Sequence, residues 1–408
     1  PPAELPDVYL DHAATTPLDP RVRAAMEPFW GSTFGNPSAL YRQGREAKLA
    51  LDGARERVAH ILNCTPAEVI FTGSGTESDN HAILGIARAA KRLKKGNHII
   101  TTAVEHHAVL VTVESLQKEG FEITLLPVDE FGRVSPAQLA AALKPETVLV
   151  SIMYANNEVG TIMPIAELTK VTKAKRVPFH TDACQAQGAL PLDIKALGVD
   201  ALTINGSKIY GPKGVGALYV RRGLPIDPIL HGGAQESSRR AGTENLANIV
   251  GLATALELAE QLRASESARL VPLRDRLIAG ILKHVPKSRL NGHPTERLPN
   301  NVHVSILDIE GEALLLYLDE FGIAAATGSA CDSQTLDPSH VVIALGLPYE
   351  FAHGSLRFTL GRSTTQAQVD YVVEHLPRIV EVLRAVSPLE LELPDTVAAR
   401  TKEILNAN

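Results

Sequence analysis

The stretch TINGSKIYGPKG, Thr203–Gly214, places a lysine directly after an apolar segment. Residues Ala201–Asn205 have the composition of a buried strand, and the glycines and Pro212 that follow mark turns. A lysine without a specific role would be expected on a helix surface. Lys208 instead follows the end of a strand inside a constrained turn, so the sequence predicts that its amine is held in place for a function.

Around this stretch, strand-like and helix-like segments alternate. The predicted strands are Glu68–Thr72, His98–Val104, Glu122–Val128, Val148–Tyr154, Phe179–Ala183, Ala201–Asn205 and Gly216–Val220. The predicted helices between them include Thr76–Lys95, Pro136–Leu143 and Ile165–Lys175. This alternation predicts an α/β fold with a mainly parallel seven-stranded sheet flanked by helices on both faces.

A long helical pattern, Gly251–Leu282, leads into a smaller α+β C-terminal domain. Its expected elements are the strands Val302–Ile306 and Leu356–Leu360 and a closing helix, Gln366–Val386. We expect a large domain over residues 16–262. Residues 1–15 and 263–408 would form the small domain.

The composition excludes several classes of protein. The 408 residues are 45% hydrophobic and carry a net charge of −6 without a prominent basic block, which argues against direct nucleic-acid binding. No apolar run approaches the roughly 18–20 residues that span a bilayer, and no secretion signal is visible. The three cysteines match no metal motif and suit a reducing compartment, so we expect a cytoplasmic protein without a metal.

Polar residues follow five of the predicted strands, where ligands bind in open parallel sheets. These strand-end segments are Gly73–Ser78, Glu105–His107, Asn156–Glu158, Thr181–Gln185 and Gly206–Lys208. The first combines small residues with the start of a helix, an arrangement that suits a phosphate group.

One ligand accounts for all five strand ends. Pyridoxal 5′-phosphate (PLP) needs a lysine for a Schiff base, a carboxylate for its pyridinium nitrogen, an anion site and a side chain over its ring. Lys208, Asp182, the helix start at Gly75-Thr76 and His106 fit these four requirements.

A second informative segment is Thr327–Ser333, TGSACDS. Its small residues predict an exposed loop, in which Cys331 has the accessibility that a nucleophilic thiol requires. Most cysteines are buried hydrophobes, and this general tendency is the expectation for Cys64 and Cys184.

The ordered motifs resemble those of the cysteine desulfurases of the NifS/IscS type, PLP enzymes of fold type I and aminotransferase class V. The resemblance covers nearly the whole chain. Its motifs are YLDHAATTPLDPRV (Tyr9–Val22), FGNPSALYRQG (Phe34–Gly44), TGSGTESDN (Thr72–Asn80), EHHAV (Glu105–Val109), ANNEVGT (Ala155–Thr161), HTDACQ (His180–Gln185), SKIYGPKGVGALY (Ser207–Tyr219), RRAGTEN (Arg239–Asn245), TGSACDS (Thr327–Ser333) and SLRFTLGRSTT (Ser355–Thr365).

The resemblance implies a homodimer that converts L-cysteine to L-alanine. Sulfur would pass as a persulfide on Cys331 to an acceptor protein, such as an iron–sulfur scaffold or a tRNA-thiolation relay. By this resemblance, Lys208 would be the Schiff-base lysine, Asp182 the pyridinium partner and His106 the acid–base group stacked on the ring. Gln185 would contact the ring oxygen, and Asn157 would lie near cofactor and substrate. Gly75 and Thr76 would bind the phosphate, Thr243 would reach the phosphate of the neighbouring subunit, and Arg357 would bind the substrate carboxylate.

Two departures from the family pattern have predicted consequences. Asn205 and Ser207 stand where the family usually has serine and histidine, which predicts weaker cofactor retention with the same reaction. Asp332 follows the thiol and is expected to raise its pKa. Three alternatives stay open: a selenocysteine lyase, an ordinary class V aminotransferase and a non-catalytic scaffold for a sulfur-assembly partner.

Overall fold

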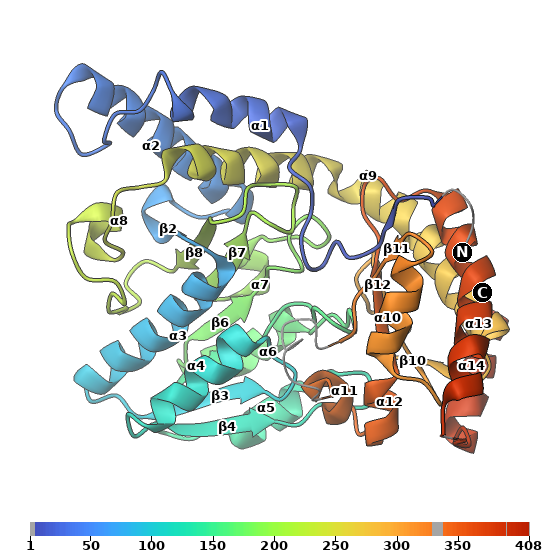
Figure 1. Ribbon diagram of the computed structural model, residues 1–408. Coiled ribbons are helices and arrows are strands. Elements are labelled where there is room, and N and C mark those ends of the chain that lie inside the picture. The colour runs from blue at the N-terminus through green and yellow to red at the C-terminus, as the bar shows by residue number, and fades with distance from the viewer. Residues whose placement is uncertain (1–4, 329–337, 389, 408) are drawn as a thin grey trace.

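A computed structural model covers the chain, and it describes residues 5–328, 338–388 and 390–407 (Figure 1). Its largest element is a seven-stranded sheet with the order β2-β8-β7-β6-β5-β3-β4. The strands are β2 (Val69–Thr72), β3 (His98–Thr102), β4 (Glu122–Leu126), β5 (Thr147–Ser151), β6 (Phe179–Asp182), β7 (Ala201–Asn205) and β8 (Gly216–Val220). Only β8 runs antiparallel to its neighbours in this sheet, so the predicted mainly parallel α/β fold is confirmed.

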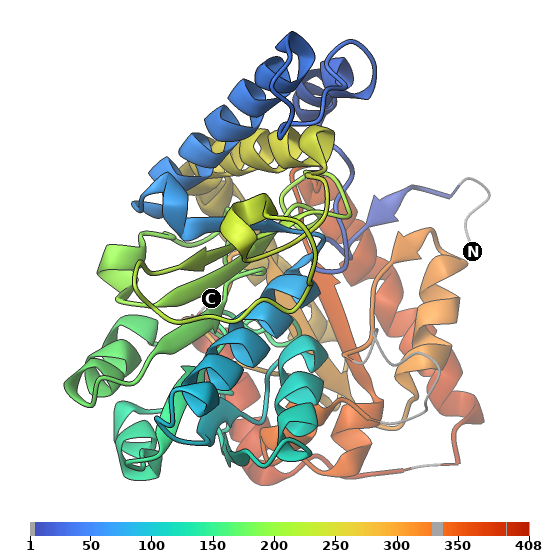
Figure 2. The same cartoon turned by 90° about the vertical axis from the view of Figure 1, so that its left-hand side faces the viewer.

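Alternate residues of these strands enter two different apolar cores, as the period of two in a strand requires. Ile99 packs in the core beneath α3 (Gly75–Arg92) and α4 (His107–Gln117), whereas Ile100 packs in the core on the other face. The helices of that second face are α1 (Pro20–Met26), α2 (Arg42–Leu62), α5 (Pro136–Ala142), α6 (Ile165–Ala174), α7 (Ile194–Leu197) and the first half of α9 (Leu246–His284). The helices on the two faces are visible in Figure 2.

A second apolar core surrounds a three-stranded antiparallel sheet with the order β12-β10-β9. Its strands are β9 (Ser288–Leu290), β10 (Asn301–Ile306) and β12 (Ser355–Thr359), and a short parallel pair joins β1 (Val8–Tyr9) to β11 (Ile323–Ala324). The helices of this part of the chain are α10 (Gly311–Asp319), α11 (His340–Ala344), α12 (Tyr349–His353), α13 (Gln366–Val386) and α14 (Asp395–Ala407). Short helical turns are η1 (Glu27–Trp30), η2 (Pro66–Glu68) and α8 (Gln235–Ser238).

The helix α9 belongs to both cores. Its residues 246–259 pack against the large sheet, and residues 270–282 pack against the small sheet. Helix α9 is longer than the predicted Gly251–Leu282, because its first turn is capped by Asn245, whose side chain accepts a hydrogen bond from the Asn248 N–H at 3.4 Å.

Three predicted strands extend two or three residues too far. The expected Val148–Tyr154 ends at Ser151, the expected His98–Val104 ends at Thr102, and the expected Glu122–Val128 ends at Leu126. Val104 beyond β3 and residues 152–154 beyond β5 are buried apolar side chains in irregular backbone, so burial and not extended conformation produced the apolar pattern there.

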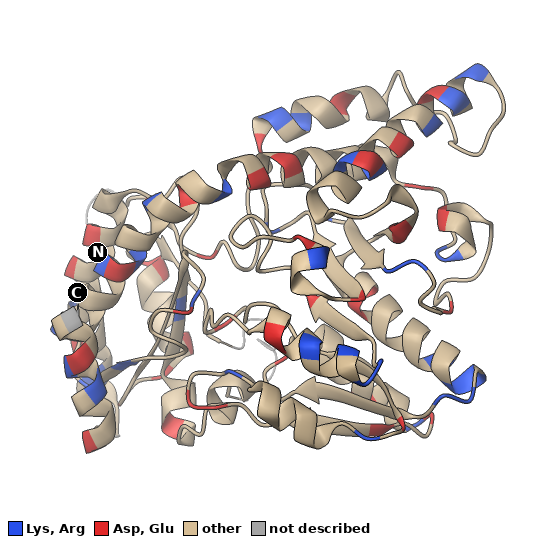
Figure 3. Ribbon diagram, turned by 180° about the vertical axis from the view of Figure 1, so that it is seen from behind, with Lys and Arg blue, Asp and Glu red and all other residues tan. Residues whose placement is uncertain are grey.

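Charged residues of both signs are interspersed along the helices seen from behind (Figure 3). Within the described ranges, no helix combines the length and the apolar character needed to span a membrane. The same residues contain no group of three or more His, Cys, Asp or Glu side chains that could hold a metal ion.

Candidate active site

The carboxyl ends of the large sheet open into a cavity of about 550 Å³. Most of the residues singled out from the sequence line this cavity: Gly75, Thr76, His106, Asn157, Asp182, Gln185, Asn205, Ser207, Lys208 and Arg357. Thr243 does not line it, but is exposed in the loop before α9. Cys331 lies outside the described residues.

The turn that carries Lys208 is fastened to the N-terminal segment of the chain. The backbone N–H and the hydroxyl of Thr16 donate to the Ser207 carbonyl at 2.9 and 3.0 Å. The Tyr210 N–H donates to the Thr16 hydroxyl at 2.7 Å, with Tyr210 in the left-handed region at a φ of 63°. Lys208 Nζ itself donates to the Ala14 carbonyl. These bonds fix where the amine enters the cavity.

Asp182 ends strand β6 and is only 8% exposed. Its Oδ1 accepts a hydrogen bond from the Cys184 N–H at 2.9 Å, which fixes the carboxylate at the cavity floor. On the same strand, His180 is fully buried between the hydroxyls of Ser151 and Thr203, at 2.8 and 3.0 Å. Burial lowers the pKa of His180 to about 3, so this imidazole is neutral and serves as a hydrogen-bonded spacer.

A second buried carboxyl group, Asp79, lines the cavity near Asp182. Burial, and secondarily the charge of Asp182, raises the pKa of Asp79 well above its usual range. Its Oδ1 lies 3.6 Å from His180 Nε2. Sequence reasoning missed Asp79, although its position four residues after Gly75 on a helix places both on one face.

Helix α3 begins at Gly75, and its N-terminus faces the cavity. The Ser74 side chain caps this helix by accepting from the Glu77 N–H at 3.0 Å. A Cβ atom at Gly75 would lie 2.7 Å from Cys184 Sγ, which is closer than packing allows. Only glycine fits here without a shift of its neighbours, and the exposed N–H groups and the helix dipole favour an anion.

His106 caps helix α4, and its Nδ1 accepts a hydrogen bond from the Ala108 N–H at 3.0 Å. The neutral ring therefore carries its proton on Nε2. Burial lowers the pKa of His106, while the charge of Asp182 acts in the opposite direction. The neighbouring ring of His107 has its centroid 4.8 Å from that of His340. His106 can thus donate a hydrogen bond from Nε2.

Glu105 is a buried carboxyl group that sequence reasoning did not assign to the site. Its oxygens accept hydrogen bonds from the Thr102 hydroxyl at 2.7 Å and the Met153 N–H at 3.1 Å. Burial raises the pKa of Glu105 to about 8. Its carbonyl oxygen lies 2.9 Å from His340 Nε2, which connects the segment between β3 and α4 to the start of α11.

Arg357 on β12 reaches the cavity from the small sheet. Its two terminal nitrogens donate to the Asn157 carbonyl at 3.0 Å and to Asp11 Oδ1 at 2.9 Å. The Nε of Arg357 and the Oδ1 of Asn157 are buried and make no hydrogen bond within the described part of the chain. Two such polar atoms at one cavity wall fit a polar ligand, since buried polar groups are normally satisfied.

The described residues on either side of residues 329–337 meet at the cavity wall. The Ser339 hydroxyl donates to Glu158 Oε2, and Gly328 lies so close that a Cβ there would be 2.5 Å from the same oxygen. Gly328 and Pro338, the described residues that flank the segment with Cys331, therefore both line the cavity. Cys64 and Cys184, the two cysteines within the described ranges, are free thiols.

A mainly parallel sheet with a lysine, a carboxylate and a helix N-terminus at its carboxyl edge defines a class of PLP-dependent enzymes. The chain belongs to the aminotransferase class V family, whose model matches residues 8–372. It is 53% identical to the cysteine desulfurase IscS of Methanosarcina thermophila, over 94% of each chain. It is 51% identical to the cysteine desulfurase IscS of Dictyoglomus turgidum, over 95% of this chain and 98% of that protein. A solved NifS-like protein superposes with a TM-score of 0.87 at 36% identity, covering 93% of this chain and all of the other.

Proposed function

We propose that the protein is a cysteine desulfurase that converts L-cysteine to L-alanine and places the sulfur as a persulfide on Cys331. The observation that carries this proposal is the convergence of Lys208, Asp182 and Arg357 on one cavity, whose wall also holds both described ends of the segment with Cys331. The identity to cysteine desulfurases extends over nearly the whole chain and supports the same reaction.

The residues present fit PLP as the cofactor. Lys208 would supply the amine that carries it, Asp182 would pair with its ring nitrogen and His106 would cover its ring. The phosphate would lie at the start of α3 near Gly75, Thr76, Asn205 and Ser207, with Thr243 of the partner subunit, and Gln185 and Asn157 would contact the ring. When bound, the cofactor withdraws electrons from the substrate α-carbon.

Arg357 would bind the substrate carboxylate. Its bonds to Asn157 and Asp11 orient the guanidinium plane, and arginine holds carboxylates in a two-point contact. The amine of Lys208 would then accept the α-proton, since Arg357 would hold the substrate at the cavity in which Lys208 lies.

Cys331 would act next as a thiolate that attacks the substrate sulfur. The new S–S bond forms as the substrate C–S bond breaks, and the electron pair of the C–S bond stays with the carbon. One proton delivered to that carbon and the return of the α-proton from Lys208 to the α-carbon would complete L-alanine, with His106 in the cavity wall taking part as an acid–base group. The persulfide would pass to an acceptor protein of iron–sulfur cluster assembly or thiolation.

We further propose that the protein acts as a homodimer in the cytoplasm, with residues 16–262 and residues 1–15 plus 263–408 as its two domains. The two separate apolar cores around the large and small sheets support this division. The exposed position of Thr243 outside its own cavity supports a role at a partner's phosphate.

The test is incubation with L-cysteine and quantitation of sulfide and alanine. Lys208→Ala and Cys331→Ala are each expected to lower the rate by roughly 10²-fold or more. The matched controls Lys170→Ala and Cys64→Ala change an exposed lysine and a thiol outside the cavity, and should keep full activity.

The same experiment separates the alternatives. Full activity of Cys331→Ala would refute the persulfide step and favour an ordinary aminotransferase. A strong preference for selenocysteine over cysteine would favour the lyase. A purified protein without the cofactor absorbance near ~410–420 nm would favour a scaffold.

A further inference from the structure

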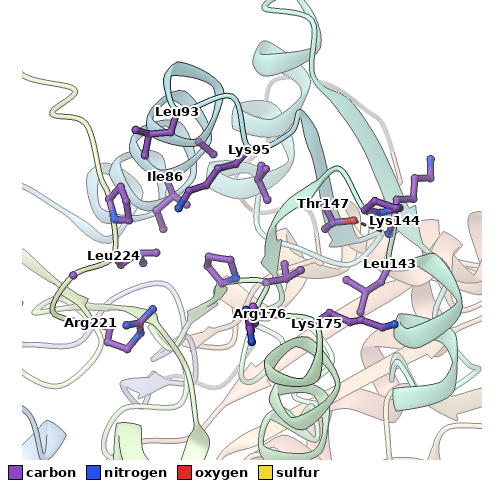
Figure 4. A pocket seen from close by; sticks show the side chains of 17 residues that line it. Ile86, Leu93, Lys95, Leu143, Lys144, Thr147, Lys175, Arg176, Arg221 and Leu224 are labelled. Carbon is purple, nitrogen blue, oxygen red and sulfur yellow. Dashed lines mark hydrogen bonds between the residues drawn. The ribbon is translucent and has the colours of Figure 1, made fainter.

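A second cavity, of about 500 Å³, lies at the opposite edge of the large sheet (Figure 4). It is formed by residues next to the amino ends of β3, β5 and β6, the end of β8 and the last turns of α3. None of its lining residues lines the candidate active site. Its volume lies within the range of small-molecule sites, roughly 300–1,000 Å³.

The floor of this cavity is apolar. Ile86, Val148, Val177 and Leu224 are between 2 and 9% exposed, and Leu93, 44% exposed, extends the apolar surface outward. In Figure 4, Ile86, Leu93 and Leu224 lie together on one side of the hollow. A ligand with an apolar body would remove this surface from water, which is favourable in proportion to the area covered.

The rim is positively charged, although the whole chain carries a net charge of −6. Five of the lining residues are cationic and none is Asp or Glu: Lys95, Lys144, Lys175, Arg176 and Arg221. Lys144 pairs with Glu122, and Arg221 pairs with Asp200 at 2.5 Å. Among the described residues, no carboxylate pairs with Lys95, Lys175 or Arg176.

Helix ends explain why cations lie here. Helices α3, α5 and α6 end at Arg92, Ala142 and Ala174, and a cation near each C-terminus interacts favourably with the helix dipole. The blue end of α3 is visible in Figure 3. Three such ends converge on one hollow, so cations that serve separate helices produce a joint positive potential over an apolar floor.

The side chains do not contribute equally to that potential inside the hollow. In Figure 4, Lys95 extends over the opening, with Arg176 and Arg221 below it, whereas the ammonium groups of Lys144 and Lys175 point away. Arg221 is neutralised by Asp200. Lys95 and Arg176 are therefore the cations available to an anion seated above the apolar floor.

We propose that this cavity binds a small organic anion. Its apolar body would lie on Ile86, Leu93 and Leu224, and its acidic group would lie between Lys95 and Arg176. This site is independent of the cysteine desulfurase reaction, since the carboxyl edge of the sheet holds the residues of that reaction.

The probe for the test is 8-anilinonaphthalene-1-sulfonate, which joins an aromatic body to one sulfonate and fluoresces in apolar surroundings. Protein loaded with PLP is titrated with the dye, so that the first cavity is filled. We expect saturable binding that weakens with added salt. The double variant Lys95→Glu/Arg176→Glu should bind roughly tenfold more weakly or worse, since two attractions become repulsions. Lys170→Glu, an exposed residue of α6 outside the cavity, makes a matched charge change and should bind as the wild type does.

Hydrogen–deuterium exchange locates the dye, which is expected to protect residues 143–148 and 221–225. Absence of saturable binding, an unchanged affinity in the double variant, or protection confined to the segments of the first cavity would each overturn the proposal. Both variants should still release sulfide from L-cysteine at the wild-type rate, so failure here is distinguishable from failure of the proposed reaction.

Discussion

The contact between Gly75 and Cys184 allows a quantitative test of how the anion site is built. A Cβ at residue 75 would lie 2.7 Å from Cys184 Sγ and 3.2 Å from Asn205 Nδ2. Overpacking of a buried site typically costs about 1–3 kcal/mol. The gain in helix propensity of alanine over glycine is at most about 1 kcal/mol and is smaller at the first helical residue. Gly75→Ala should therefore lower the free energy of unfolding by about 1–2 kcal/mol.

The Cys184→Ala substitution removes the sulfur atom that a Cβ at residue 75 would meet, and so tests whether this contact causes the loss of stability. In the Cys184→Ala background the new methyl group finds space, so the cost of Gly75→Ala should largely disappear. The double-mutant cycle should show a favourable coupling of about 1–2 kcal/mol. Gly53→Ala in α2 is a matched control, because a Cβ there meets nothing within 4 Å. That change should stabilise the protein by roughly 0.5–1 kcal/mol through helix propensity.

The measurement is urea unfolding at a fixed excess of PLP, followed by circular dichroism, for the wild type and the variants. Dialysis against PLP gives the cofactor affinity of each. The reasoning would be refuted if the effects of Gly75→Ala and Cys184→Ala added to within about 0.5 kcal/mol. It would also fail if Gly75→Ala were as stabilising as Gly53→Ala.

Two further outcomes follow from the buried titratable groups. The native state keeps the proton of Glu105 up to a pKa of about 8, while the unfolded chain loses it near the ordinary value of 4.5, so this group's contribution to stability falls as pH rises from about 4.5 to 8. Glu105→Gln should therefore gain stability relative to the wild type in urea unfolding between pH 5 and pH 8, and a constant difference would contradict the assignment. Burial raises the pKa of Cys64 to about 12 and that of Cys184 well above its usual range. The folded Cys331→Ala variant should accordingly show no rapid reaction with a thiol reagent at pH 8 and two reactive thiols in urea. Rapid labelling of the folded variant would contradict the raised pKa of half-buried Cys64 or of buried Cys184.

The sequence positions of the site residues were predictable, because a buried strand is a run of apolar residues and the site residues are polar residues that follow such a run. Lys208 and Asp182 could be assigned in this way, and the cavity brings them together. The exact ends of β3 and β5 were not predictable, since buried irregular backbone has the same apolar composition as a strand.

Contacts between distant parts of the chain could not be derived from local patterns. Asp11 meets Arg357 across 346 positions of sequence, and the segment around Thr16 holds the Ser207 carbonyl. Asp79 lies on a helix that the pattern predicted correctly, but its desolvation depends on the sheet beneath it. The role of Thr243 depends on a second subunit and stays a prediction.

The 39-residue helix α9 has a consequence for how the molecule denatures. Helix α9 contributes apolar side chains to both cores. Unfolding of either core would therefore remove about half of the tertiary contacts that stabilise this helix. Independent melting of the two sheets would leave exposed leucines along a single helix in water. Thermal or urea denaturation should therefore show a single cooperative transition in which the cores around the large and the small sheet unfold together.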